Sequence, residues 1–290
     1  MYPALRQVIA SKSLRFKVLR FKVLRFKVLH TARILACAAA KTGMDARIPI
    51  PINHRLTTMA PIGFRILPFP PQAPAKIINA LRKIATAHLS DNMHRLHAVG
   101  SGLWPCHRGG KLVGTALTVK VSPGDNLMVH KAIDIARPGD VIVVDAGGVN
   151  TQAIIGEIMS SLAERNGAAG MVIDGAIRDA DALALSSFPV YAGGVTHRGP
   201  YKNGPGEINV PVVIGEAVVN PGDIIIGDDD GLLVLPQALA AETIKLALDQ
   251  AKKEAALLKA IRGKGKVDRR WVDETLRTKG CVIPAKLRSR

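Results

Sequence analysis

The residues best suited to chemistry in this chain are two acids and an arginine. Glu157 is followed by twenty residues and then by the pair Arg178-Asp179. A carboxylate such as that of Asp179 is a hard oxygen donor of the kind that Mg²⁺ or Mn²⁺ prefers. A guanidinium such as that of Arg178 can bind a carboxylate or an enolate oxygen through two parallel N–H donors. Together these groups predict a site for a divalent cation and an anionic substrate.

The segment between the two acids predicts that they meet in space. Residues 158–166 have the period of an amphipathic helix, and an apolar strand over 171–173 follows a glycine stop. A helix of nine or ten residues rises about 15 Å. The returning strand of five or six residues covers about 17–20 Å. The two lengths nearly cancel, so we expect Arg178-Asp179 beside Glu157, next to free N–H groups at the helix N-terminus.

Each of the three side chains also has a purely structural interpretation. Asp179 could cap a helix that begins near Asp181. Glu157 is favourable in the first turn of a helix, and Arg178 could form a surface ion pair. Spacing alone does not decide between these roles and a catalytic one.

The positive charge of the chain lies in its terminal segments. Of the formal net charge of +17, residues 1–59 contribute +11 and residues 252–290 contribute +9, so residues 60–251 carry −3. A nucleic-acid-binding protein needs a basic surface on the fold itself. We therefore expect no nucleic-acid partner.

The cysteines and the hydropathy pattern favour a cytoplasmic protein. Cys37, Cys106 and Cys281 are far apart and have no disulfide spacing, as is typical of a reducing compartment. No apolar run reaches the roughly 18 residues that a membrane span needs. We expect no membrane partner.

The first 60 residues are expected to lie outside the fold. The pentapeptide Leu-Arg-Phe-Lys-Val occurs three times over 14–28, a period that fits neither a helical face nor a strand. Their basic, acid-poor composition resembles that of a transit peptide or an interfacial membrane segment. Alternatively, they precede a working start at Met44 or Met59. Residues 1–60 are thus interpreted as a basic extension, disordered or not native.

Short apolar strands and fewer helices alternate along the rest of the chain. The expected strands are 112–121, 141–144, 171–173, 190–192, 212–214, 224–226 and 232–235. The expected helices are 76–87, 92–96, 127–137, 158–166, 181–186 and 238–261. This alternation predicts an α/β domain over 61–236 with a mixed sheet layered on helices, and a C-terminal helix with a basic tail over 237–290.

Several motifs in this part of the chain resemble those of a known family. The motifs are Gly156-Glu157, Asp174-Gly-Ala-Ile-Arg-Asp179, His197-Arg-Gly-Pro-Tyr-Lys-Asn-Gly-Pro-Gly206, Asn209-Val-Pro-Val212, Pro221-Gly-Asp223 and Gly227-Asp-Asp-Asp-Gly231. They resemble the 4-hydroxy-4-methyl-2-oxoglutarate aldolases, which share their fold with the regulator of ribonuclease activity A. The likeness is clearest over 145–236 and extends more loosely back to Ile62. It implies a β/β/α swivelling-type fold and a homotrimer or homohexamer.

The resemblance also implies an activity and assigns the site. It implies a divalent-metal-dependent lyase that cleaves 4-hydroxy-4-methyl-2-oxoglutarate-type 2-oxo acids to pyruvate, with oxaloacetate decarboxylase activity through the same enolate. Asp179 would hold Mg²⁺ or Mn²⁺, Arg178 would bind the substrate, and Glu157 would hold water on the metal. The backbone N–H groups expected to bind the substrate carboxylate are those of Gly156, Glu157, Ile158 and Met159.

Two further residues extend this assignment. Lys202 is expected in a loop that faces a phosphate or carboxylate group. Glu254 on the C-terminal helix is the candidate acid that would reach the metal waters of a neighbouring subunit, as the resemblance implies. No lysine lies between Glu157 and Asp179, which weighs against a Schiff-base aldolase.

Two other functions remain open in the sequence. A relative of this fold inhibits a ribonuclease without metal chemistry, so a non-catalytic binding or regulatory protein is the main alternative. A methyltransferase acting on a menaquinone precursor is the other. It lacks support because no glycine-rich strand–helix turn is followed by an acidic ribose-binding residue.

Overall fold

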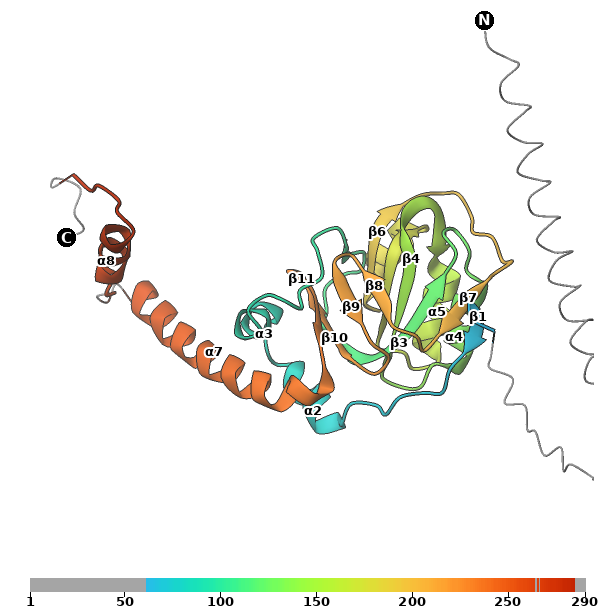
Figure 1. Cartoon of the computed structure of the whole chain (residues 1–290), viewed down its shortest axis with the longest axis horizontal. Helices are drawn as coiled ribbons and strands as arrows, with labels where there is room; N and C mark the ends of the chain where they lie inside the picture. The colour runs from blue at the N-terminus through green and yellow to red at the C-terminus, as the bar shows by residue number, and fades with distance from the viewer. Residues whose placement is uncertain (1–60, 264, 266, 285–290) are drawn as a thin grey trace, which may run out of the picture. The chain divides into compact units, whose positions relative to one another are not determined.

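A nine-stranded mixed sheet forms the centre of the protein (Figure 1). The computed structural model describes residues 61–263, 265 and 267–284, so the expected extension over 1–60 lies outside the described residues. The strands are β1 (Phe64–Ile66), β2 (Trp104–Pro105), β3 (Leu112–Val121), β4 (Asp140–Ile155), β5 (Gly170–Ile177), β6 (Val190–Val195), β7 (Gly206–Ile208), β10 (Ile224–Asp228) and β11 (Gly231–Leu235). Their order is β1-β7-β3-β4-β5-β6-β2, and β10 pairs with both β3 and β11. A separate hairpin joins β8 (Val212–Ile214) to β9 (Ala217–Val219).

The four central strands β3, β4, β5 and β6 run parallel. Their apolar runs are buried almost without interruption, as is typical of strands covered on both faces. Every expected strand is present, but β4 and β5 continue well beyond the predicted 141–144 and 171–173. The continuation was not predicted because β4 keeps its pairing with β5 through register shifts across a glycine- and polar-rich segment.

The sheet is covered differently on its two faces. The helices are α2 (Ala75–Leu81), α3 (Thr86–Asn92), α4 (Leu127–Ile135), α5 (Glu157–Arg165), α6 (Ala180–Leu185), α7 (Ala240–Arg262) and α8 (Arg270–Thr278), with a short 3₁₀ turn over Gln237–Leu239. One core cluster packs α4 and α5 on one face, and a second packs the β8–β9 hairpin on the other. This β/β/α layering confirms the predicted fold class.

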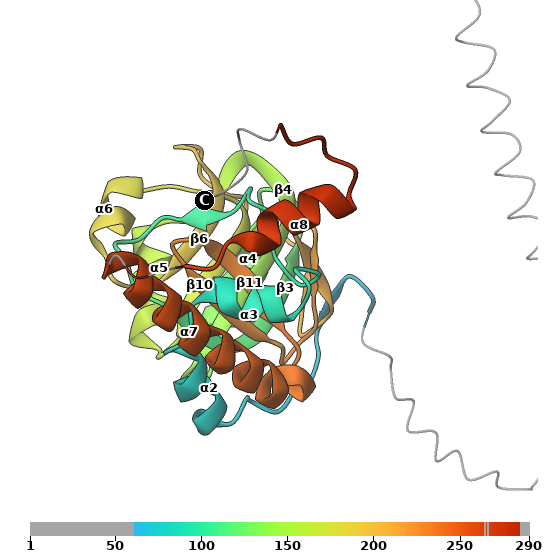
Figure 2. The same cartoon turned by 90° about the vertical axis from the view of Figure 1, so that its left-hand side faces the viewer.

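A third cluster joins the β10–β11 end of the sheet to three helices. It contains Leu81 of α2, Leu89 of α3 and Ala247 of α7, together with the apolar side chains of β10 and β11. Figure 2 shows α2, α3 and α7 side by side, in agreement with their contacts. The described part of α7 therefore packs on two helices of the same chain.

The predicted helix over 76–87 is wrong, because the structure has two helices there. α2 ends at Leu81 and α3 begins at Thr86, so the predicted short helix over 92–96 is wrong as well. The break is stabilised from distant parts of the chain. The Thr86 N–H donates to Asp228 Oδ2 at 2.9 Å, and the Lys111 ammonium donates to the Ile84 carbonyl.

The C-terminal segment holds one helix more than the sequence predicted. α7 matches the expected 238–261 closely, but α8 lies inside the segment that was interpreted as a basic tail. Asp268 lies just before the N-cap residue Arg269, and its Oδ1 accepts the Arg270 N–H at 3.0 Å. Among the described residues, no helix is both long and apolar enough to cross a membrane.

Candidate functional site

The candidate site forms where β4 and β5 end beside each other. β4 leads through Gly156 into α5, and β5 leads directly into Arg178. The Arg178 N–H donates to the Ile155 carbonyl at 3.0 Å, which holds the end of β5 against the end of β4. The arrangement therefore brings Arg178-Asp179 to the N-terminus of α5, where the spacing predicts it.

Asp179 joins the two segments through its side chain. Its Oδ2 accepts the Glu157 N–H at 3.1 Å, so the carboxylate stabilises the first turn of α5. Asp179 has a left-handed backbone (φ 56°) at the N-cap of α6, yet it makes no side-chain capping hydrogen bond there. A capping role for α6 is thus wrong. A non-glycine residue in this conformation is uncommon and often marks a functional segment.

Gly156 lets the two segments approach this closely. A Cβ atom at Gly156 would lie 2.3 Å from Asp179 Oδ2 and 2.9 Å from Arg178 Cγ. The backbone of Gly156 is extended, so the constraint is space and not conformation. Any side chain at this position would displace the carboxylate or the arginine.

Arg178 and Asp179 are close but not tightly paired. Arg178 Nε lies 3.7 Å from Asp179 Oδ2, and the two side chains are 44% and 41% exposed. An exposed pair at this distance contributes little to stability. Both groups are therefore available to a ligand.

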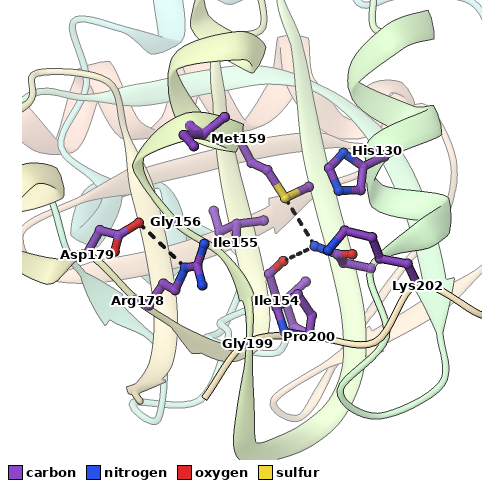
Figure 3. Close-up of a pocket in the computed structure, with 12 residues that line it drawn as sticks. His130, Ile154, Ile155, Gly156, Met159, Arg178, Asp179, Gly199, Pro200 and Lys202 are labelled. Carbon is purple, nitrogen blue, oxygen red and sulfur yellow. Dashed lines mark hydrogen bonds and ion pairs between the residues drawn. The ribbon is translucent and has the colours of Figure 1, made fainter. Parts of the chain in front are cut away.

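Both side chains border a cavity of about 280 Å³. It is lined by Asn126, His130, Ile154, Ile155, Gly156, Ile158, Met159, Arg178, Asp179, Gly199, Pro200 and Lys202. Figure 3 shows Arg178 and Asp179 on one side of the cavity and His130 and Lys202 on the other. The cavity is therefore bordered by charged or titratable groups at both ends, with apolar side chains between them.

All but one of the predicted site residues line this cavity. Gly156, Ile158, Met159, Arg178 and Asp179 line it, whereas the exposed Glu157 side chain does not. The Glu157 N–H is engaged by Asp179, so it is not free for a substrate. Glu157 therefore lies next to the cavity without lining it, and its backbone N–H holds Asp179 in place.

The far side of the cavity contains two polar residues that the sequence did not single out. Asn126 is buried, and its Nδ2 donates to the Ile154 carbonyl at 2.9 Å and lies 3.2 Å from Met159 Sδ. Its Oδ1 has no hydrogen-bond partner within the described residues. His130 follows four residues later, a spacing that places both on one face at the start of α4. That spacing is the signal that could have identified them.

The surroundings of His130 favour its neutral form. Burial lowers the pKa of its imidazole, and the nearby Lys202 ammonium lowers that pKa further, against the opposite effect of Asp134. A neutral imidazole offers one N–H donor and one lone pair. Lys202, expected to face an anionic group, supplies the positive charge on this side of the cavity.

The residues present fit a cation held by a single carboxylate. In the described part of the chain, no three His, Cys, Asp or Glu side chains form a metal-binding group. Mg²⁺ commonly keeps several water ligands and takes only one or two carboxylates. Oδ2 of Asp179 is engaged by α5, which leaves Oδ1 for such a cation.

Glu254 lies on α7 and not in the cavity lining of its own chain. One of its oxygens lies 2.7 Å from His88 Nε2, and the other accepts from Gln250 Nε2 at 2.8 Å. These hydrogen bonds lower the pKa of the Glu254 carboxyl. The contacts tie Glu254 to α3 within one chain.

Comparisons with known proteins agree with the fold and with the site segment. A family model for RraA-like proteins, described as Aldolase/RraA, matches residues 86–234. A Halalkalibacterium halodurans protein named "Putative 4-hydroxy-4-methyl-2-oxoglutarate aldolase" is 40% identical over 190 residues, which cover 66% of this chain and 90% of that protein.

Two solved structures are also similar to this chain. An uncharacterized protein from Pseudomonas syringae has a TM-score of 0.61 at 30% identity, covering 69% of this chain and 95% of that one. RraAS2 from Streptomyces coelicolor, described as an unusual member of the RNase ES inhibitor RraA family, has a TM-score of 0.59 at 29% identity. That match covers 64% of this chain and 98% of that one.

Proposed function

Because the chain belongs to the Aldolase/RraA family, we propose that it is a divalent-metal-dependent lyase that cleaves 4-hydroxy-2-oxo acids to pyruvate. The 4-hydroxy-4-methyl-2-oxoglutarate type is the proposed substrate class, and oxaloacetate decarboxylation is a side activity. The observation that carries the proposal is the convergence of Arg178, Asp179 and the α5 N-terminus on one cavity. A cation ligand, an enolate-binding guanidinium and free N–H groups then face the same bound molecule.

The first turn of α5 is the proposed site for the 2-oxo acid carboxylate. Since Asp179 takes the Glu157 N–H, the N–H groups of Ile158 and Met159 are the ones available to a ligand. Helix N-termini bind carboxylates through such groups and through the helix dipole. The carboxylate would thus lie beside the cation ligand Asp179.

Cleavage requires that negative charge be stabilised on the pyruvate fragment. As the C3–C4 bond breaks, its electron pair enters the enolate, and the proton of the C4 hydroxyl must leave. When bound at Asp179, Mg²⁺ or Mn²⁺ would supply the Lewis acidity that polarises the 2-oxo group. The Arg178 guanidinium would stabilise the enolate oxygen from within the cavity.

The opposite side of the cavity is suited to the C4 half of the substrate. We assign acceptance of the hydroxyl proton to a ring nitrogen of His130, whose lowered pKa keeps a lone pair available. The Lys202 ammonium would bind an anionic group carried by the same half. Protonation of the enolate then yields pyruvate, and C4 leaves as a carbonyl carbon.

The test is a pyruvate-release assay on a panel of 4-hydroxy-2-oxo dicarboxylates and oxaloacetate, with and without EDTA. We expect release with Mg²⁺ or Mn²⁺ and none with EDTA. Arg178→Lys should lower kcat by on the order of a hundredfold because it loses the bidentate fork. Arg165→Lys, on the exposed end of α5, is the matched control. Unchanged kcat and KM in Arg178→Lys would remove Arg178 from the site.

The alternative function is a non-catalytic regulatory protein, which the likeness to RraAS2 favours. The same assay separates the two functions. A folded protein that releases no pyruvate from any substrate in the presence of Mg²⁺ or Mn²⁺ would support the regulatory function.

We also propose a homotrimer or homohexamer in which Glu254 completes the site of a neighbouring subunit. The exposed Leu257, Leu258 and Ile261 on the distal part of α7 support an interface there. Mixing inactive Asp179→Ala chains with inactive Glu254→Ala chains should restore part of the activity. A monomer by light scattering, or no complementation after proven subunit exchange, would refute the shared site.

A further inference from the structure

The tripeptide Pro-Gly-Asp occurs three times, ending at Asp125, Asp140 and Asp223. In two of these turns the carboxylate accepts the backbone N–H of the residue three positions earlier. Asp140 accepts the Arg137 N–H at 2.9 Å, and Asp223 accepts the Asn220 N–H at 2.9 Å. These two carboxylates close their own turns.

The carboxylate of Asp125 accepts N–H groups that lie later in the chain, and not the N–H three residues earlier. It is only 3% exposed, and its Oδ1 accepts the Leu127 N–H at 2.9 Å. Its Oδ2 accepts the N–H of Asn203 at 2.6 Å and that of Gly204 at 3.0 Å. Asp125 therefore connects the start of α4 to the loop between β6 and β7, nearly eighty residues later in the chain.

These two segments form the far wall of the cavity. The start of α4 supplies Asn126 and His130, and the loop supplies Gly199, Pro200 and Lys202 (Figure 3). Two backbone hydrogen bonds between Gly124–Asn126 and Tyr201 run alongside the carboxylate. The width of the cavity thus depends on how firmly the loop is held against α4.

We propose that Asp125 is a positioning residue that fixes the Lys202 loop against α4 and so sets the geometry of the C4 side of the site. This positioning role depends on the proposed function only for the identity of the molecule that the cavity binds. A buried carboxylate is stable because N–H donors replace its hydration, and such charge-assisted hydrogen bonds are stronger than neutral ones. The residue acts through the loop and touches no substrate.

An amide at this position cannot reproduce the arrangement. Three N–H donors face the two oxygens of Asp125, so in Asp125→Asn the new NH₂ group must face at least one of them. Because the NH₂ group and the backbone N–H that it faces are both donors, that buried N–H is left without an acceptor. Asp140→Asn is the matched control, because it removes an equally buried carboxylate from another copy of the tripeptide, at the start of β4 and away from the cavity.

Limited trypsin digestion of the full chain measures the loop directly. The digestion is run below the unfolding temperature, and cleavage after Lys202 is followed by mass spectrometry. The rate of this cleavage should rise on the order of tenfold in Asp125→Asn. Asp140→Asn should leave the rate at Lys202 unchanged. Asn203→Pro removes one donor from the other side, and it decides the matter if Asp125→Asn does not fold. Because trypsin does not cleave a Lys–Pro bond, the loop of Asn203→Pro is followed by cleavage after Arg198, which lies in the same loop. Wild-type cleavage rates in the folded variants, after Lys202 for Asp125→Asn and after Arg198 for Asn203→Pro, would overturn the proposal.

A double-mutant cycle separates positioning from general stability. If Asp125 acts through the loop, Lys202→Ala should lower kcat/KM in the wild-type background and have almost no further effect in Asp125→Asn. Additive effects would overturn the proposal. Absence of pyruvate release from the wild-type protein would refute the proposed function instead, while the digestion would still decide the role of Asp125.

Discussion

Two hollows in this protein differ in what lines them more than in size. The cavity at Arg178 and Asp179 measures about 280 Å³, and a groove between the end of α3 and the start of α7 measures about 400 Å³. The groove is lined by Asn92, Met93, His94, Leu96, His97, Leu239, Glu242, Thr243 and Leu246. The larger hollow is thus formed by two packed helices and the turn that follows α3.

The smaller hollow lies where strand ends, a helix N-terminus and a loop converge. Ligands of open α/β sheets bind at such positions because several chain ends can present polar groups together. In the groove, Thr243 Oγ1 already donates to the Leu239 carbonyl at 2.9 Å. In the cavity, the buried Oδ1 of Asn126 has no partner in the described residues. A buried polar atom without a partner, and not volume, distinguishes the cavity from the groove among the described residues.

The largest expected effect comes from removing the carboxylate at the cavity. Asp179→Ala should abolish both Mn²⁺ binding and pyruvate release, because it removes the proposed protein ligand of the cation. Isothermal titration with Mn²⁺ gives a readout that does not depend on turnover. Asp181→Ala, an exposed acid in the first turn of α6, is the control. If Asp179→Ala bound Mn²⁺ with wild-type affinity, Asp179 would not be the cation ligand, and the distinction between the two hollows would fail.

The next effect follows from the close approach at Gly156. Gly156→Ala places a methyl group against Asp179 Oδ2 and should lower kcat/KM by on the order of ten- to a hundredfold. Gly100→Ala is the control, since its added Cβ would be 3.7 Å from its nearest neighbour. If Gly156→Ala were as active as Gly100→Ala, the geometry around Asp179 would not matter for the reaction.

A pH profile tests the far side of the cavity. Because burial and Lys202 lower the pKa of His130 below its usual value of about 6.5, the imidazole stays neutral to lower pH than an ordinary histidine. As the pH falls through this lowered pKa, His130 gains a proton and can no longer accept one. We therefore expect log kcat/KM to fall on the acidic side, below about pH 6.5. His130→Gln should have a lower kcat/KM, and its pH profile should lack this acidic fall. An unchanged acidic fall in His130→Gln would exclude His130 as its source.

The smallest effect is expected in the groove. Leu246→Gln adds a polar group to a half-exposed side chain there and should leave kcat/KM within about twofold of the wild type. A loss comparable to that of Gly156→Ala would show that the groove takes part in function. Thermal unfolding of both variants separates such a loss from instability.

The pairing of Glu157 with Arg178-Asp179 could be predicted because it depends on local geometry. The rise of one helix and the length of one strand place the two segments together, and the structure joins them through Asp179. The direction of the Glu157 side chain could not be predicted. It depends on which face of the first helical turn is turned toward solvent.

The break between α2 and α3 shows where sequence reasoning fails. Residues 76–87 contain no glycine or proline, and their composition favours one continuous helix. The break is stabilised by Asp228 and Lys111, which lie 142 and 27 residues away from the groups they bind. The position of Lys202 beside Asn126 and His130 could not be predicted for the same reason, since the loop that carries Lys202 is held by contacts with α4 that are distant in sequence.

The two sides of the cavity belong to separately anchored parts of the chain. Arg178 and Asp179 are fixed by β5 and α5, whereas the wall of Lys202 is a loop fastened to α4. Substitutions within residues 200–205 can therefore change the wall that faces the C4 half of a substrate while Arg178 and Asp179 stay held by β5 and α5. Such a division would allow a lineage, or a directed-evolution library, to exchange one substrate for another while the proposed cation ligand and the enolate-binding arginine stay in place.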